Sequence, residues 1–120
     1  MDDIIPIYSN DFGMAFQWKN NELKSRTKVQ VVFKDTGFFI TRSELLNFSD
    51  NIQYTIDNNY LQCQDCVNSE SCRKLLLNTP AYQVTLALDT SELLSMKDLV
   101  EGTIFQLDLQ NYLNEICSNN

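Results

Sequence analysis

The residues of this chain that are most able to do chemistry are its cysteines. Three of them, Cys63, Cys66 and Cys72, stand in a C-x2-C-x5-C spacing within the segment LQCQDCVNSESCRKLLL. A C-x2-C turn lets two thiolates converge on one tetrahedral ion, and a third thiolate reaches the same ion if the loop folds back. The spacing therefore predicts a structural zinc site, whose fourth ligand is Cys117, a carboxylate of the same segment, or a residue of another subunit.

Other interpretations of these cysteines remain open. Free thiols without a ligand are ordinary in a reducing compartment, where structural disulfides are disfavoured. A redox pair is a second alternative, although the thioredoxin-like dithiol sits at a helix start, whereas Cys63 follows a predicted helix and a short linker. The run also resembles part of the ligand pattern around auxiliary iron–sulfur clusters in radical enzymes. Zinc binding and thiol redox chemistry are thus the alternatives to a chain without a cofactor.

The rest of the composition removes most enzyme classes. The chain of 120 residues has no histidine, and the usual serine, cysteine and metal-hydrolase mechanisms depend on that side chain. Its three glycines, at positions 13, 37 and 102, stand too far apart to form a P-loop or a dinucleotide-binding turn. The residues therefore favour a protein that is not an enzyme.

Charge restricts the possible partners. The net charge of −7 repels a phosphate backbone, so nucleic acid is not expected as a ligand. Six bases lie between Lys19 and Arg42, whereas Lys97 is the only base among six acids from Asp89 onward. The first residues, MDDIIPIYSN, contain no apolar run like that of a signal peptide or a membrane span. We therefore expect a cytoplasmic protein that has no membrane partner.

Period-2 alternation of large and small or polar side chains predicts four strands. Three of them follow one another closely, in GMAFQW, TKVQVVFK and FFIT, with turn residues between them. They are expected to form an antiparallel meander. A fourth strand, AYQVTLALD, comes later in the sequence and is expected to lie within the same sheet. The aromatic residues of these strands are expected mostly in the core.

The helices are predicted from apolar residues spaced three and four apart. Thr41 and Glu44 have the spacing of a capping box, and the helix that they begin is expected to end at residues 57–59. The segment SCRKLLLNTP is expected to form one or two helical turns. Asp89 and Glu92 repeat the cap and begin a long helix.

Two features of this last helix suggest a change of direction. Gly102 inside it predicts a close helix crossing or a bend. Beyond it, Leu109, Tyr112, Leu113 and Ile116 form a stripe at a shifted angle. The shift predicts a kink or a short second helix that returns the C-terminal residues to the body.

The segments FGMAFQWKNN and VQVVFKDTGFFITRSELLNF, together with the later cysteine run, resemble a group of short bacterial proteins of uncharacterised function. The resemblance covers roughly the first half of the chain. It implies a small α+β fold and no established activity.

These observations predict one α+β domain over residues 1–120. Its antiparallel sheet of about four strands, a meander plus one later strand, packs against two or three helices. We expect a non-catalytic binding or regulatory module that forms a homodimer through a sheet edge or its C-terminal helices. The alternative is a structural zinc or thiol-redox protein that uses Cys63, Cys66, Cys72 and Cys117.

Overall fold

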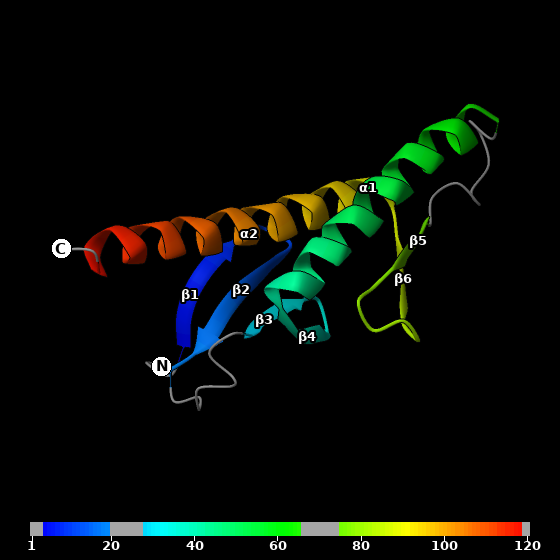
Figure 1. Ribbon diagram of the computed structural model, residues 1–120. Coiled ribbons are helices and arrows are strands. Elements are labelled where there is room, and N and C mark those ends of the chain that lie inside the picture. Colours follow the sequence, from blue (N-terminus) through cyan, green and yellow to red (C-terminus); the bar gives the residue numbers. More distant parts are fainter. Residues whose placement is uncertain (1–3, 20–27, 66–74, 119–120) are drawn as a thin grey trace.

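The predicted α+β fold class is confirmed: a four-stranded antiparallel sheet packs against two helices, and a small two-stranded sheet lies beside them (Figure 1). The computed structural model describes residues 4–19, 28–65 and 75–118. In chain order the described elements are β1 (Ile4–Ser9), β2 (Gly13–Trp18), β3 (Lys28–Phe33), β4 (Thr36–Thr41), α1 (Arg42–Asp65), β5 (Leu75–Asn78), β6 (Thr85–Leu88) and α2 (Thr90–Ser118).

The larger sheet has the strand order β1-β2-β3-β4, so its fourth strand is β1 and not the predicted later strand. Sequence periodicity missed β1 because IIPIYS is apolar at nearly every position and Pro6 interrupts it. Its register against β2 shifts between Pro6 and Tyr8, which marks a β-bulge. A proline and a bulge both disfavour further pairing at a sheet edge, so β1 is a blunted edge strand.

The two faces of this sheet have different surroundings. On the face toward the helices, Val29, Val31 and Ala15 are buried in the core. Met14, Phe16 and Trp18 share the opposite face of β2, as the alternation predicts, but they do not belong to that core. Phe16 is nevertheless buried, as expected for the strand aromatics, whereas Trp18 is 40% exposed. The expectation is therefore wrong for Trp18.

The second sheet corrects two sequence predictions. The leucine run expected to be helical forms β5, in which Leu75 and Leu77 are buried and Leu76 is exposed. Three consecutive leucines fit a strand because its side chains alternate between faces. The later strand is shorter than predicted and pairs with β5 as a separate ribbon. Tyr82 lies outside the strand, with 87% of its surface exposed.

Helix α1 begins as predicted and continues further. The Glu44 side chain accepts a hydrogen bond from the Thr41 backbone N–H, and the Thr41 hydroxyl accepts one from the Glu44 N–H. This reciprocal cap satisfies N–H groups of the first turn. The helix passes through residues 57–59, where it was expected to end, and reaches Asp65. Asparagine only tolerates the left-handed cap conformation and does not impose it.

Helix α2 is one continuous helix, so the predicted kink or second helix is wrong. Asp89 and Glu92 form the predicted reciprocal cap. The buried face of α2 consists of Leu93, Met96, Leu99, Val100 and Thr103. Neither described helix is long and apolar enough to cross a membrane.

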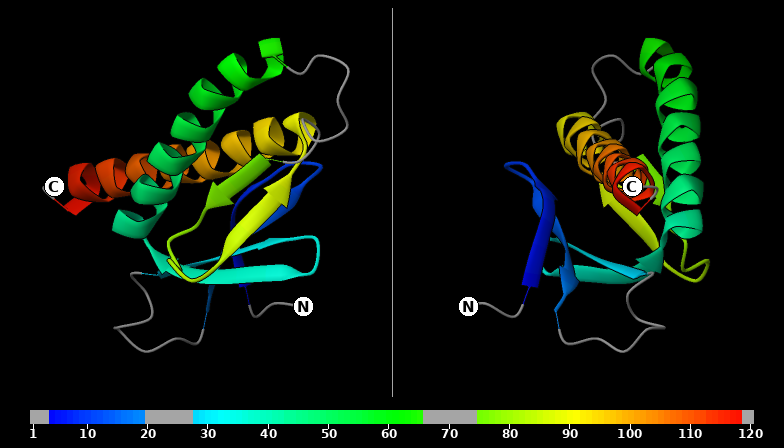
Figure 2. Two further views of the ribbon diagram at one scale, coloured as in Figure 1. Left: turned by 90° about the vertical axis from the view of Figure 1, so that its right-hand side faces the viewer. Right: turned by 60° about the vertical axis from the view of Figure 1, so that its left-hand side comes forward.

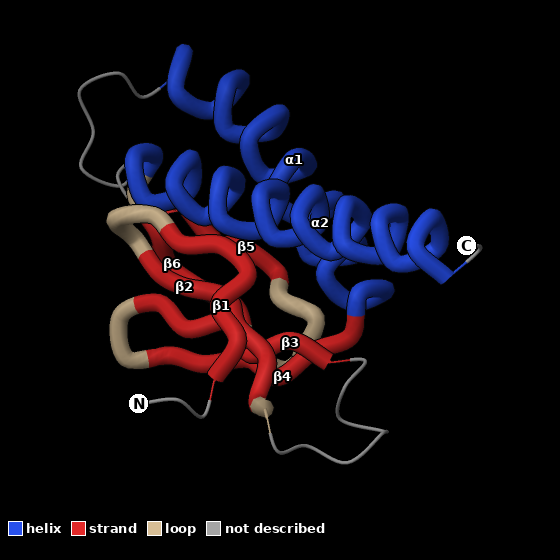
Figure 3. The backbone as a smooth tube through the Cα atoms, turned by 90° about the vertical axis from the view of Figure 1, so that its left-hand side faces the viewer, coloured by secondary structure: helices blue, strands red, loops and turns tan. Residues whose placement is uncertain are grey.

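The core lies between the inner face of the larger sheet and the two helices (Figure 2). Helix α2 packs on β1 and β2, while α1 packs on β4 and also contacts α2 and the β5–β6 ribbon. Both helices lie on the same side of the strands, and no described element covers the outer face of the larger sheet (Figure 3). The C-terminal half of α2 extends past β1, away from the strands (Figure 1).

Gly102 marks a close approach between α2 and β1, where a helix crossing or a bend was expected. In Gly102→Ala, the added Cβ would lie 2.5 Å from ring carbons of Tyr8. Alanine stabilises a helix by about 1 kcal/mol relative to glycine. However, the Tyr8 ring cannot move away easily, because its hydroxyl is bound to Asp98. We therefore expect overpacking to lower the free energy of unfolding by about 1 kcal/mol or more in total. Urea unfolding followed by circular dichroism measures this loss. In a Tyr8→Ala background the same change should instead raise stability, and a loss there would contradict the steric cause.

Candidate functional site

The predicted zinc ligands fall largely on residues about which the structure gives no side-chain information. Cys66 and Cys72 lie outside the described residues, while Cys63 and Cys117 stand in the last turns of α1 and α2. The C-terminal ends of these helices lie at opposite ends of the molecule (Figure 1). A site that used both Cys63 and Cys117 would therefore need two copies of the chain, and the zinc site itself stays a prediction.

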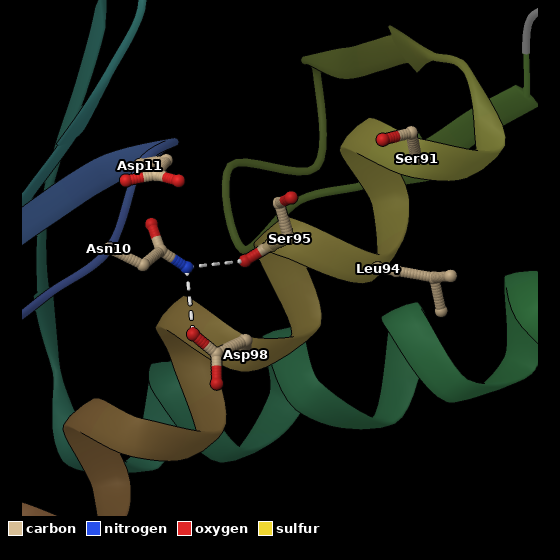
Figure 4. A pocket seen from close by; sticks show the side chains of 6 residues that line it. All are labelled: Asn10, Asp11, Ser91, Leu94, Ser95 and Asp98. Atoms are coloured by element: carbon tan, nitrogen blue, oxygen red, sulfur yellow. Dashed lines mark hydrogen bonds between the residues drawn. The ribbon is translucent and has the colours of Figure 1, made fainter.

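A polar cluster joins β1 to α2 beside a hollow of about 340 Å³. The Tyr8 hydroxyl lies 3.0 and 2.9 Å from the two carboxylate oxygens of Asp98, to which it donates. The Asn10 amide donates to Asp98 Oδ2 at 2.9 Å and to the Ser95 carbonyl at 3.0 Å (Figure 4). We call Tyr8, Asn10 and Asp98 the latch, because they hold the β1–β2 turn against α2.

The contacts of the latch are those of a structural cluster. The side-chain oxygen of Asn10, Oδ1, accepts hydrogen bonds from the backbone N–H groups of Phe12 and Gly13. Both ends of the side-chain amide are therefore used. The hydrogen bond to Asp98 raises the pKa of Tyr8 above its usual value. This phenol therefore keeps its proton at neutral pH and does not act as a base. Among the described residues, no three carboxylate or thiol groups are placed to hold a metal ion.

A second hollow, of about 640 Å³, lies at the end of the larger sheet. Its lining includes Phe12, Met14, Val32 and Lys34. Lys34 forms an ion pair with Glu92 of α2 and lies over the Phe12 ring. The cation is thus held by its own chain, and the hollow presents mainly apolar surface.

The most unusual surface is a line of positions along α2, spaced alternately three and four residues apart, which we call the seam. The first three, Ser95, Asp98 and Gly102, meet Asn10 and Tyr8 of the same chain. The spacing keeps successive seam residues on one side of the helix. The seam consists of Ser95, Asp98, Gly102, Phe105, Leu109, Tyr112 and Ile116.

Beyond Gly102 the seam becomes apolar, and its side chains are exposed. Phe105 and Tyr112 are 62% and 61% exposed, and Leu109, Leu113 and Ile116 are exposed as well. We call residues 105–118 the overhang: Leu107 and Asp108 still contact the body, and the last turns of α2 extend past β1 (Figures 1 and 3). The five side chains present apolar surface on the order of several hundred Å², a size at which exposed patches are commonly interaction sites.

The side of the overhang opposite the seam carries polar residues. Val100, Thr103 and Leu107 belong to the face of α2 that packs on the body. The positions one heptad beyond Thr103 and Leu107 are Gln110 and Asn114, which are exposed. The apolar stripe therefore moves to a different face of the same straight helix, which explains the shifted angle seen in the sequence. The sequence prediction omitted Phe105, although its spacing from Leu109 would have placed it on the stripe.

One ion pair lies beside the seam. The Arg42 guanidinium donates to both carboxylate oxygens of Asp108, at 2.7 and 3.0 Å. These hydrogen bonds lower the pKa of Asp108, so its charge is kept and is compensated by that of Arg42. Glu115 is the other ionisable carboxylate side chain of the overhang, and the overhang contains no lysine or arginine.

In comparisons with known proteins, no family model, curated protein or solved structure matched this chain. The resemblance to short bacterial proteins therefore stays a prediction. The candidate functional site rests on geometry alone, and the apolar part of the seam is the surface that this geometry singles out.

The latch predicts a stability loss in Asn10→Ala. This change removes two hydrogen bonds that the amide donates to α2 and two that it accepts within the turn. We therefore expect a loss of about 1–3 kcal/mol in the free energy of unfolding. Chemical unfolding of the full chain measures the loss. Asp11→Ala, in the neighbouring exposed position, is the matched control and should change stability little. Equal effects of the two changes would contradict the structural role of the Asn10 amide.

The zinc hypothesis predicts a metal content that depends on particular cysteines. A site within the C-x2-C-x5-C segment should hold about one zinc ion per chain, which Cys63→Ser and Cys66→Ser should remove. Cys117→Ser should keep the metal in a monomer, because the ends of α1 and α2 lie far apart (Figure 1). Elemental analysis and thiol titration of untagged protein, purified without chelator, measure both quantities. Four reactive thiols without metal would contradict the zinc site.

Proposed function

We propose that this chain is a cytoplasmic, non-catalytic binding module that works as a homodimer, with the overhang as its self-association surface. The observation that carries the proposal is the row of exposed apolar side chains on a helix half that leaves its own body. The compartment rests on the sequence alone.

The helix supports self-association better than the edge of β1 does. Strand β1 carries Pro6 and a bulge, which remove the regular row of donors and acceptors that strand addition needs. The overhang offers side chains in the pattern of an apolar helix interface, with steps of three and four residues. Between the β1 edge and the C-terminal helices, these observations favour the helices.

Area and charge both fit a second copy of the chain. Two such surfaces would together bury about 1,000 Å², the lower end for a specific interface, so we expect a weak and reversible dimer. The net charge of −7 opposes association in general. At the overhang this repulsion is reduced, because Arg42 compensates Asp108 beside the seam.

Self-association is tested by sedimentation velocity from low to high micromolar concentration. We expect the wild type to form dimers in this range, and Leu109→Lys to weaken them about tenfold or more, since it places an unpaired charge in an apolar interface. Asn114→Lys adds the same charge on the other side of the overhang and is the matched control. Dimerisation should survive this control change.

Two results would remove the proposed function. The first is a wild-type chain that stays monomeric throughout the micromolar range. The second is a dimer that loses the same affinity in Leu109→Lys and Asn114→Lys, because that loss would not depend on the apolar stripe.

A further inference from the structure

The structure also points to the direction and register of the contact between the two copies. We infer that the overhangs pair antiparallel, with Phe105 of one copy against Ile116 of the other and Leu109 against Tyr112. This inference rests on the proposed function, to which it adds a defined partner geometry. It follows from the spacing of the seam and from the space that the latch occupies.

The register follows from the spacing of the seam. In an antiparallel helix pair, a seam position that follows a three-residue step lies opposite a position of the partner that precedes a three-residue step. Each seam position can therefore face only certain positions of the other copy. The register centred between Leu109 and Tyr112 pairs all four apolar seam positions of each copy. A shift of one heptad toward the N-terminus pairs Tyr112 with Gly102, which already lies against Tyr8. A shift in the other direction pairs only Tyr112 with Ile116 among the described seam positions.

The direction follows from the latch. In a parallel pair, the N-terminal half of the second α2 would continue along the same seam, next to Ser95 and Asp98. That space is filled by Asn10 and Tyr8, which bind these positions in each copy. In an antiparallel pair, the body of the second copy lies beyond the end of the first overhang. The parallel arrangement therefore collides with the chain's own turn, and the antiparallel arrangement does not.

The surface chemistry is compatible with this pairing. Each of the four layers would join one aromatic or branched side chain to another, without a charge in the seam. Leu113 lies next to the seam and would cover Tyr112 from the side. Asp108 stands at the flank with Arg42, where the ion pair keeps contact with water. Each layer can thus be dry while the charges remain at the rim, as in most stable interfaces.

Complementary charges test the register in the full-length chain. Leu109→Asp and Tyr112→Lys should each weaken the homodimer, because each leaves two unpaired charges in the seam. When the two variants are mixed, the inferred register places the introduced carboxylate of one copy against the introduced ammonium of the other in one layer, and keeps the native Leu109–Tyr112 contact in the other. We expect the mixed dimer to bind about tenfold or more tightly than either variant alone. Native mass spectrometry identifies the mixed dimer by mass, and sedimentation gives its affinity.

The matched control is a mixture of Leu109→Asp with Phe105→Lys, which carries the same two charges in layers that do not face each other. Recovery in this mixture would show a different register. No recovery in either mixture, with a wild-type dimer that Leu109→Asp disrupts, would overturn the antiparallel register and leave the proposed function standing. A wild-type monomer, or variants that dimerise as the wild type does, would overturn both. Circular dichroism and thermal melting of each variant confirm that a lost dimer is not a lost fold.

Discussion

The length of α2 relative to the body is the constraint on which the rest of the structure depends. The helix has 29 residues, so it is about 44 Å long at 1.5 Å per residue. A four-stranded sheet is only about 15–20 Å wide, since neighbouring strands lie about 4.8 Å apart. The sheet therefore covers the first part of α2, where the fully buried residues end at Thr103. The overhang is the part of the helix for which the described residues supply no further strand.

The latch fixes which side of the overhang faces outward. A helix turns by about 100° per residue, so a rotation by one position would carry the apolar stripe away from the side on which β1 lies. Such a rotation is prevented by the bonds from Tyr8 and Asn10 to α2 and by the contact at Gly102. Gly102 and Asp98 of the seam thus contact Tyr8 and Asn10 of the same chain. The large apolar residues continue the same line into solvent.

The sequence predicted the local elements better than their assembly. Both helix starts were predictable because Thr41–Glu44 and Asp89–Glu92 satisfy their own backbone groups, which is a local interaction. Strand β1 and the pairing of β5 with β6 were not predictable, since apolar runs such as IIPIYS and LLLN carry no period that distinguishes a strand from a buried helix turn. The shifted stripe on α2 was visible in the sequence. It was attributed to a kink because the sequence does not show where the body ends.

The uneven charge of the sequence also has an explanation within one chain. The basic segment that ends at Arg42 and the acidic α2 are joined by two ion pairs, Lys34 with Glu92 and Arg42 with Asp108. The first pair lies near the start of α2, and the second lies where the overhang begins to leave the body. The exposed Arg42–Asp108 pair contributes little to stability, on the order of 0–1 kcal/mol. The placement of the two pairs matters more than their strength, because they keep charge at the flanks of α2 and leave the outward part of the seam uncharged.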